Sequence, residues 1–159
     1  WYLSEEDGHA HFYTREGQRK PKQHTRGAFE VSAPQISADG RQVWLLGNRA
    51  WPGDYEVYRL DLGNDQLSEV TALDGVESFQ LSPDQSQLLV SWSSSYLPTQ
   101  IAVLPASGGE TKPLTDTRSA AFKAVDWLPP QYVQVPSKHG AGTIWGKFYR
   151  PATLEPGKR

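Results

Sequence analysis

A repeat of about 45 residues constrains the fold of this chain more than any other feature of its sequence. The turn motif Ser37-Ala38-Asp39-Gly40 recurs 45 residues later as Ser82-Pro83-Asp84-Gln85, and a short apolar run follows each copy. The run Glu56-Val57-Tyr58-Arg59-Leu60 is echoed after 44 residues by Gln100-Ile101-Ala102-Val103-Leu104. A period of this length, with several short strands in each unit, is typical of β-propeller blades.

The head of the chain fits the same repeat as a partial copy. His11-Phe12-Tyr13-Thr14 lies 45 residues before the run that begins at Glu56. Thr25 lies 46 residues before Thr71, and Thr71 recurs after a further 44 residues as Thr115. The threonines therefore mark the same position in three successive units.

The repeat predicts an all-β fold of two and a half four-stranded propeller blades. Residues 1–26 would supply the last three strands of one blade, and complete blades would follow in 27–72 and 73–116. The strands expected in the complete blades are 28–36, 42–48, 55–61, 66–72, 75–81, 87–93, 99–104 and 110–115. A β-sandwich also uses many short strands, but it would not repeat a Ser-x-Asp motif at this interval.

Composition narrows the class of protein further. Six Trp, seven Tyr and five Phe are too many for a disordered chain. A net charge of −2 without a long basic run argues against nucleic-acid and anionic-membrane partners, and no apolar run suggests a membrane segment. The lack of cysteine excludes disulfides, thiolate nucleophiles and cysteine metal sites, and we expect no cofactor. Because the chain lacks Met and begins with Trp1, we expect it to be an internal or processed piece of a longer protein.

The last part of the chain departs from the repeat. The pattern ends near Thr117, and the stretch 117–130 closes with Leu128-Pro129-Pro130, which predicts a stiff, extended linker. Two short β runs then flank Ser137-Lys138-His139-Gly140-Ala141-Gly142, which predicts a hairpin loop. We therefore expect residues 131–159 to form a separate β extension.

Four stretches carry motifs of one known family. Residues 1–13 read W-Y-L-S-E-E-D-G-H-A-H-F-Y, and residues 25–31 read T-R-G-A-F-E-V, with Phe29 where Trp is usual. Residues 82–98 contain S-P-D and S-W-S-S-S-Y-L-P, and the tail 134–151 begins Q-V-P-S and ends W-G-K-F-Y-R-P. In this order and spacing the motifs resemble the dipeptidyl peptidase IV branch of the prolyl oligopeptidase family of serine peptidases.

The resemblance implies an N-terminal propeller that caps a C-terminal α/β-hydrolase domain. The implied activity of the parent protein is hydrolysis of peptides after Pro or Ala near the N-terminus, and the implied location is periplasmic or secreted. This chain would then hold part of the substrate-gating propeller and the first strands of the hydrolase domain, whose remainder is missing. The alternative is a non-catalytic, TolB-like propeller that binds a protein partner. Because both ends of such an arc are open, we expect self-association through the exposed blade faces.

No catalytic residue is expected within the chain. An α/β-hydrolase nucleophile lies in a G-x-S-x-G turn, and the sequence contains none. Glu5-Glu6 belongs to a turn motif and is not the family's pair of substrate-binding glutamates, which the resemblance assigns to an upstream segment. The resemblance places the Asp and His of the catalytic triad beyond Arg159. The clustered serines are interpreted as polar strand and loop residues; they are Ser91, Ser93, Ser94 and Ser95. We expect the chain alone to be inactive.

The histidines raise the question of a metal site. His9 and His11 alternate as residues on one face of a strand do, which is a spacing that a metal ion uses, and Asp7 or His24 would be the nearest further ligand. A structural hydrogen bond from His11 is the favoured interpretation, so we expect no metal. His139 lies in a Gly-rich loop and is expected to be exposed.

Turn aspartates, aromatic residues and a basic cluster could each serve either the fold or a function. Asp39 and Asp84 are expected to accept backbone N–H bonds within turns rather than to act as general bases. Trp51-Pro52-Gly53 is the loop most open to contact with a substrate or partner. The aromatic residues expected to fill the space between blades are Trp44, Tyr58 and Trp92. The basic residues expected to form a solvated edge are Arg15, Arg19, Lys20, Lys22 and Arg26.

Overall fold

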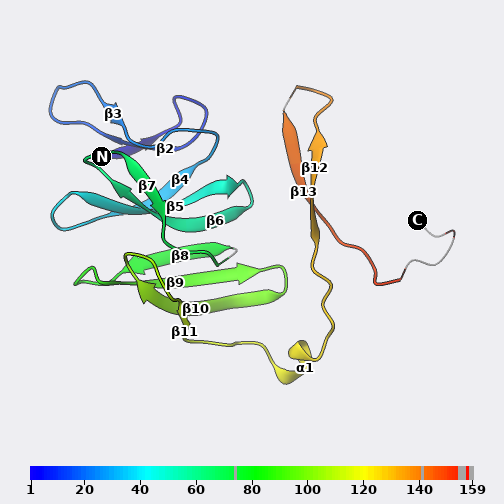
Figure 1. The fold of residues 1–159 in the computed structure, drawn as a ribbon. Helices are drawn as coiled ribbons and strands as arrows, with labels where there is room; N and C mark the ends of the chain where they lie inside the picture. Colours follow the sequence, from blue (N-terminus) through cyan, green and yellow to red (C-terminus); the bar gives the residue numbers. More distant parts are fainter. Residues whose placement is uncertain (74, 141, 154–156, 158–159) are drawn as a thin grey trace.

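A computed structural model describes residues 1–73, 75–140, 142–153 and 157. The fold is nearly all β, as the repeat predicts. Figure 1 shows three antiparallel sheets stacked one above another, with a two-stranded hairpin beside them at the end of a long linker. Parts of three predicted segments lie outside the described residues: position 74 of the last blade, position 141 of the hairpin loop, and positions 154–156 and 158–159 of the tail.

The strands follow the predicted order. The first sheet contains β1 (Tyr2–Ser4), β2 (His11–Thr14) and β3 (Lys22–Gln23). The second contains β4 (Val31–Ile36), β5 (Gln42–Trp51), β6 (Asp54–Asp61) and β7 (Gln66–Glu69). The third contains β8 (Val76–Leu81), β9 (Gln87–Ser94), β10 (Leu97–Pro105) and β11 (Lys112–Pro113). Within each sheet the strands pair with their neighbours in sequence, so the propeller-blade prediction is confirmed.

The linker differs from the extended segment that its prolines predict. Residues Ala120–Lys123 form one helical turn, α1, between the third sheet and the hairpin. Ser119 caps this turn, because its hydroxyl accepts the backbone N–H of Phe122 at 3.1 Å. The hairpin itself consists of β12 (Gln131–Pro136) and β13 (Thr143–Phe148). No helix in the described part of the chain has the length and apolar character needed to cross a membrane.

The core lies in two layers between the sheets. Val43 and Leu45 on β5 join the cluster between the first and second sheets, whereas Trp44 and Leu46 join the cluster between the second and third. Both faces of β5 are therefore buried, as expected for a blade between two others. The predicted role of the aromatic residues is confirmed, since Trp44 and Trp92 belong to one layer and Tyr58 to the other.

A hydrogen-bonded clamp recurs in all three sheets at the positions that the repeat aligns. The clamp threonines Thr25, Thr71 and Thr115 each accept a backbone N–H from the third strand of the repeat unit, at 3.0, 2.7 and 2.9 Å respectively. The residue before each donor also bonds the threonine hydroxyl: these residues are His11, Glu56 and Gln100. The backbone N–H that donates to the threonine hydroxyl no longer bonds a carbonyl of the neighbouring strand. This explains why β7 and β11 end earlier than the sequence pattern predicts.

Each clamp also reaches the connection to the next part of the chain. Glu56 accepts the backbone N–H of Leu73 at 2.7 Å, and Gln100 accepts that of Thr117 at 3.1 Å. His11 donates through Nε2 to the carbonyl of Gly27 at 3.1 Å, since a carbonyl can only accept. The structural hydrogen bond expected of His11 is thus confirmed.

The Ser-x-Asp motifs fix the turns after β4 and β8. The hydroxyl of Ser37 donates to Asp39 at 2.6 Å, and Asp39 accepts the backbone N–H of Arg41 at 3.0 Å. The second copy repeats the first bond between Ser82 and Asp84 at 2.6 Å. These bonds confirm that the repeated aspartates organise turns.

Candidate functional site

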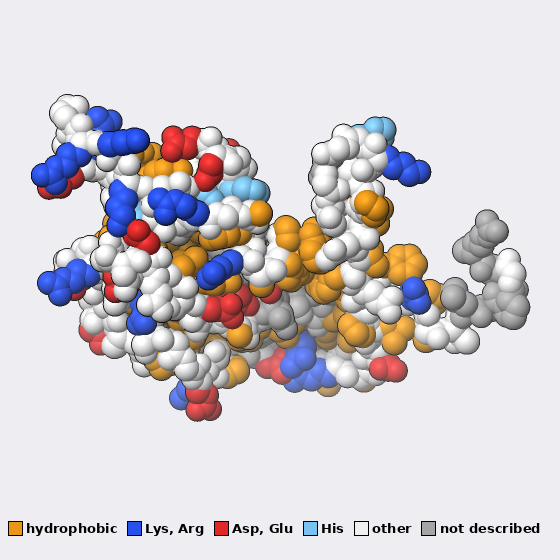
Figure 2. All heavy atoms as spheres, turned by 45° about the horizontal axis from the view of Figure 1, so that its top comes forward, with side chains coloured by type: hydrophobic (Ala, Val, Ile, Leu, Met, Phe, Trp, Pro, Cys, Tyr) orange, Lys and Arg blue, Asp and Glu red, His pale blue; other side chains and the backbone are white. Residues whose placement is uncertain are grey.

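An aromatic-lined cleft lies between the propeller sheets and the tail hairpin. It has a volume of about 690 Å³, and its walls come from the β5–β6 turn, the β9–β10 turn, the linker and the hairpin. Figure 2 shows hydrophobic side chains gathered where the stacked sheets meet the hairpin. Segments far apart in the sequence thus form one site, which we call the aromatic cleft.

Trp51 forms one side of the aromatic cleft. Its ring centroid lies 4.4 Å from that of Tyr132 and 5.6 Å from that of Trp145, so the β5–β6 turn contacts both strands of the hairpin. Gly53 permits this placement, because a Cβ at position 53 would lie 2.3 Å from the Trp51 ring. The loop that the sequence leaves open to a functional role therefore contacts the chain's own tail.

Lys147 adds the main positive charge on the hairpin side. Its Nζ lies 5.6 Å from the centroid of the Tyr132 ring, in the geometry of a cation–π contact. The same atom donates to the hydroxyl of Ser95 at 3.4 Å. This contact joins the β9–β10 turn to β13, so both turns of the neighbouring sheets hold the hairpin.

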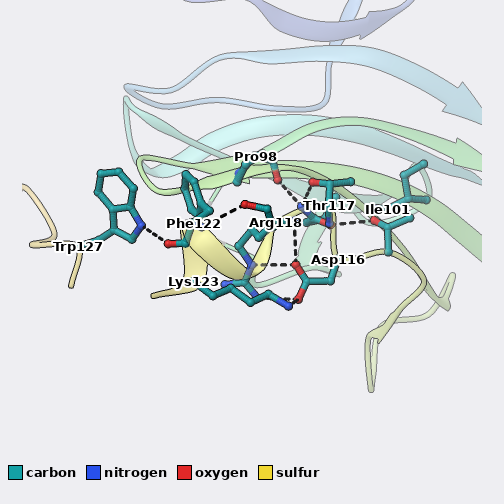
Figure 3. Close-up of polar contacts among 11 residues, drawn as sticks. Pro98, Ile101, Asp116, Thr117, Arg118, Phe122, Lys123 and Trp127 are labelled. Carbon is teal, nitrogen blue, oxygen red and sulfur yellow. Dashed lines mark hydrogen bonds and ion pairs between the residues drawn. The ribbon is translucent and has the colours of Figure 1, made fainter. Parts of the chain in front are cut away.

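A second aromatic group ties the linker to the third sheet. Tyr96 stacks on Trp127 with ring centroids 4.8 Å apart, and Trp127 lies at the same centroid distance from Phe122. The indole N–H of Trp127 donates to the carbonyl of Phe122 at 2.9 Å (Figure 3). Tyr149, just beyond the hairpin, meets Tyr96 edge-on at 6.3 Å.

Charged residues fix the linker where it leaves β11. Asp116 accepts from Arg118 Nε at 2.9 Å and from Lys123 Nζ at 2.7 Å, as Figure 3 shows. Hydrogen bonds from Arg118 and then from Lys123 hold the pKa of Asp116 well below its usual range. The carboxylate is therefore ionised at neutral pH and acts as an acceptor rather than as a proton donor.

The serine cluster lies along β9 and at the wall of the aromatic cleft. Ser93 donates to Glu77, and the hydroxyls of Ser91 and Ser78 share a bond of 2.8 Å. In the described residues no serine hydroxyl bonds a histidine ring, and the one serine–histidine bond runs from the backbone N–H of His139 to the hydroxyl of Ser137 in the hairpin loop. A serine nucleophile needs an adjacent base, so this geometry corresponds to polar strand and turn residues.

The histidines lie away from the aromatic cleft. His11 uses both ring nitrogens in its clamp, and its Nε2 is 3.8 Å from Asp7. His24 bonds Thr14 at 2.7 Å and Asp65 at 2.6 Å, which connects β3 to the β6–β7 turn. Across the described ranges, no three His, Cys, Asp or Glu side chains are grouped so that they could hold a metal ion.

The contact of His24 with Asp65 is one that the sequence analysis missed. Burial raises the pKa of Asp65, but hydrogen bonds from Lys22 and His24 outweigh it and lower the pKa below its ordinary value. Lys22 Nζ lies 2.9 Å from the same carboxylate. No local motif marks this pair, because the two partners lie in different repeat units.

The remaining predicted residues are exposed. His139 is exposed in the hairpin loop, as predicted. The residues of the basic cluster point mostly into solvent, where Arg19 pairs with Glu16 and Arg26 donates to the carbonyl of Gln23. The solvated-edge interpretation of this cluster is confirmed.

The fold and the aromatic cleft define a class of protein: a β-propeller segment whose chain continues into a hairpin held against the propeller turns. Sequence comparison supplies the family. The model of the dipeptidyl peptidase IV (DPP IV) N-terminal region matches residues 1–99, which is more than half of the chain, so the chain belongs to this family. The resemblance found in the motifs is thereby confirmed.

Comparison with solved structures agrees with the fold. The crystal structure of Porphyromonas gingivalis dipeptidyl peptidase 4 is similar, with a TM-score of 0.73 and 21% sequence identity. The match covers 91% of this chain and 21% of that chain, so the protein described here spans about a fifth of the length of that structure. At this identity the likeness shows the fold alone. No curated protein sequence matches the chain.

Proposed function

We propose that this chain is part of the substrate-gating propeller of a serine exopeptidase that cleaves peptides after Pro or Ala near their N-terminus. Membership of the DPP IV N-terminal region family is the observation that carries the proposal. The stacked sheets support it, because a propeller beside a hydrolase site admits peptides and excludes folded proteins by size.

We further propose a domain organisation for the chain. Residues 1–26, 27–72 and 73–116 are one partial and two complete blades, 117–130 is the linker, and 131–159 begins the hydrolase domain. The aromatic contacts of Trp51 support this organisation, since they fix a hairpin outside the repeat against the blade turns. In this proposal the aromatic cleft is the junction between the two domains.

The catalytic triad would then belong to a part of the protein outside these residues. The serines at the aromatic cleft lack a neighbouring histidine in the part of the chain that the structure describes, which supports this view. The interaction-module alternative would need a free rim, but the Trp51 turn that would serve as such a rim is occupied by the hairpin.

Hydrolysis of a Gly-Pro chromogenic substrate tests the proposal. We expect no turnover by the 159-residue chain, and turnover by the complete product of its gene that a serine-directed inhibitor abolishes. Replacing the serine of the G-x-S-x-G turn in the complete product by Ala is the matched control. A complete product that has no such turn and no activity would contradict the proposal and favour the interaction module.

A further inference from the structure

A separate pocket lies between the first two sheets, beside their edge strands β3 and β7. It has a volume of about 410 Å³. One wall comes from the connection between β3 and β4, and the other comes from β5, β7 and the turn before β7. We call it the rim pocket. Its lining residues are His24, Thr25, Arg26, Phe29, Arg49, Asp65, Gln66 and Leu67.

Two arginines from different walls face the rim pocket, and neither is neutralised. Arg26 donates through Nη2 to the carbonyl of Gln23 at 2.8 Å, and Arg49 donates through Nη1 to that of Leu67 at 3.4 Å. Among the described residues, no carboxylate lies within 4.0 Å of either guanidinium. A guanidinium has five N–H donors, so one bond to a carbonyl positions it and leaves other donors free.

Other polar groups of the rim pocket already have partners. The ring of His24 donates through Nδ1 to Asp65 at 2.6 Å, and its Nε2 bonds Thr14 at 2.7 Å. Lys22 lies 2.9 Å from the same Asp65 carboxylate and offsets its charge. The hydroxyl of Thr25 is held in its clamp. The free charged donors are therefore those of the two arginines, which suit a negatively charged ligand that accepts hydrogen bonds, such as a carboxylate or a phosphate.

The rim pocket also has an apolar wall, which Gly27 helps to form. Gly27 has a φ of +130°, in the region that favours glycine, and a Cβ there would lie 3.0 Å from the ring of Phe29. This turn allows Arg26 and Phe29 to line the same pocket. Phe29 is 8% exposed and Leu67 is half-buried. Positive charge thus lies beside apolar surface.

We propose that the rim pocket binds an acidic peptide segment of a partner protein, with a carboxylate between Arg26 and Arg49 and an apolar side chain against Leu67. A carboxylate is planar and can accept two parallel N–H bonds from one guanidinium. Asp65 disfavours phosphate, because the repulsion between one wall charge and a dianion is twice that for a singly charged carboxylate.

This inference goes beyond the proposed function, because a peptidase propeller and an interaction module can each carry such a pocket. The rim pocket and the aromatic cleft have no lining residue in common. Neutralising Arg26 and Arg49 should therefore leave hydrolysis of a Gly-Pro substrate by the complete gene product unchanged. Failure of this inference and failure of the proposed function are thus distinguishable.

Nitrogen-15 NMR of the arginine side chains measures the binding directly. The probe is a blocked hexapeptide of alternating Glu and Leu, added to the 159-residue chain at constant pH and ionic strength. We expect saturable shifts of the Nε–H signals of Arg26 and Arg49. Arg26→Gln and Arg49→Gln should each weaken binding roughly fivefold, because each removes one ion pair at a partly exposed site. The double variant should not bind detectably.

Arg19→Gln is the matched control, since Arg19 pairs with Glu16 outside the rim pocket and its loss should leave the affinity unchanged. A blocked hexapeptide of alternating Gln and Leu should not bind, and inorganic phosphate should bind more weakly than the acidic peptide. Absence of saturable shifts at Arg26 and Arg49 in the unsubstituted chain would overturn the proposal without recourse to any variant. Equal weakening by Arg19→Gln, equal binding of the neutral peptide, or tighter binding of phosphate would each do the same.

Discussion

The clamp at Thr71 should contribute more to stability than its equivalent at Thr115. Thr71→Val keeps the shape of the side chain but removes the hydroxyl, which accepts the N–H of Val57 at 2.7 Å and donates to Glu56. Val57 is fully buried, so its N–H would lose its side-chain acceptor away from water, and a carboxylate would lose a donor. The expected loss in free energy of unfolding is about 2–4 kcal/mol.

The third sheet provides the internal comparison. Thr115→Val removes the same two kinds of bond. The hydroxyl of Thr115 accepts the backbone N–H of Ile101, a residue that is 40% exposed, and it donates to the neutral side chain of Gln100. Water can replace the acceptor of the Ile101 N–H, whereas Gln100 is only 2% exposed and loses a neutral donor, so we expect about 1–2 kcal/mol, less than for Thr71→Val. Thr71→Ser retains the hydroxyl and serves as the control for the first variant.

Urea unfolding followed by tryptophan fluorescence measures these differences, at a protein concentration where sedimentation shows a single species. The order Thr71→Val, then Thr115→Val, then wild type in increasing stability is the expected result. Equal losses for the two valine variants would refute the argument that burial and charge set the strength of the clamp. So would a loss from Thr71→Ser as large as that from Thr71→Val.

Two further predictions concern the turns and the hairpin. Hydrogen bonds from the hydroxyls of Ser82 and Ser86 lower the pKa of Asp84 to about 2, below its usual 3.8. The ionised carboxylate therefore stabilises the folded turn at pH values above the unfolded pKa. This contribution is lost as the pH falls through about 2. Asp84→Asn should flatten that part of the stability-against-pH curve measured by urea unfolding, and an unchanged curve would contradict the assignment. Trp51→Ala should raise the rate of amide hydrogen–deuterium exchange in residues 131–148 by roughly tenfold, because an aromatic pair contributes about 0.5–1.5 kcal/mol. Amide exchange in the three stacked sheets should stay the same. Equal exchange in 131–148 for this variant and wild type would show that Trp51 does not hold the hairpin.

The repeat made most of the fold predictable. Strand positions and turns depend on local pattern, and Ser37-Ala38-Asp39-Gly40 carries enough local chemistry to place its turn. The alignment of Thr25, Thr71 and Thr115 was visible in the sequence as well. Its meaning was not, because the donors to these hydroxyls lie 13 or 14 residues away on other strands.

The candidate site was harder to predict. The aromatic cleft brings Trp51 together with Tyr132 and Trp145, whose separation in sequence exceeds any local period. The helical turn at Ala120–Lys123 was missed because one turn is too short for a hydrophobic periodicity to reveal it. Local rules thus placed the strands, whereas the contacts between units came only from the folded chain.

Protection of the Trp44 indole tests the stacking of blades, on which the family fold and the proposed function both depend. The indole N–H of Trp44 donates to the carbonyl of Ala106 at 2.8 Å, across the interface between the second and third sheets. Proton NMR of the chain in deuterated water should show the slowest indole exchange among its six tryptophans for Trp44, assigned by its absence in Trp44→Phe. Exchange of the Trp44 indole as fast as that of the exposed Trp1 would contradict the stacked arrangement.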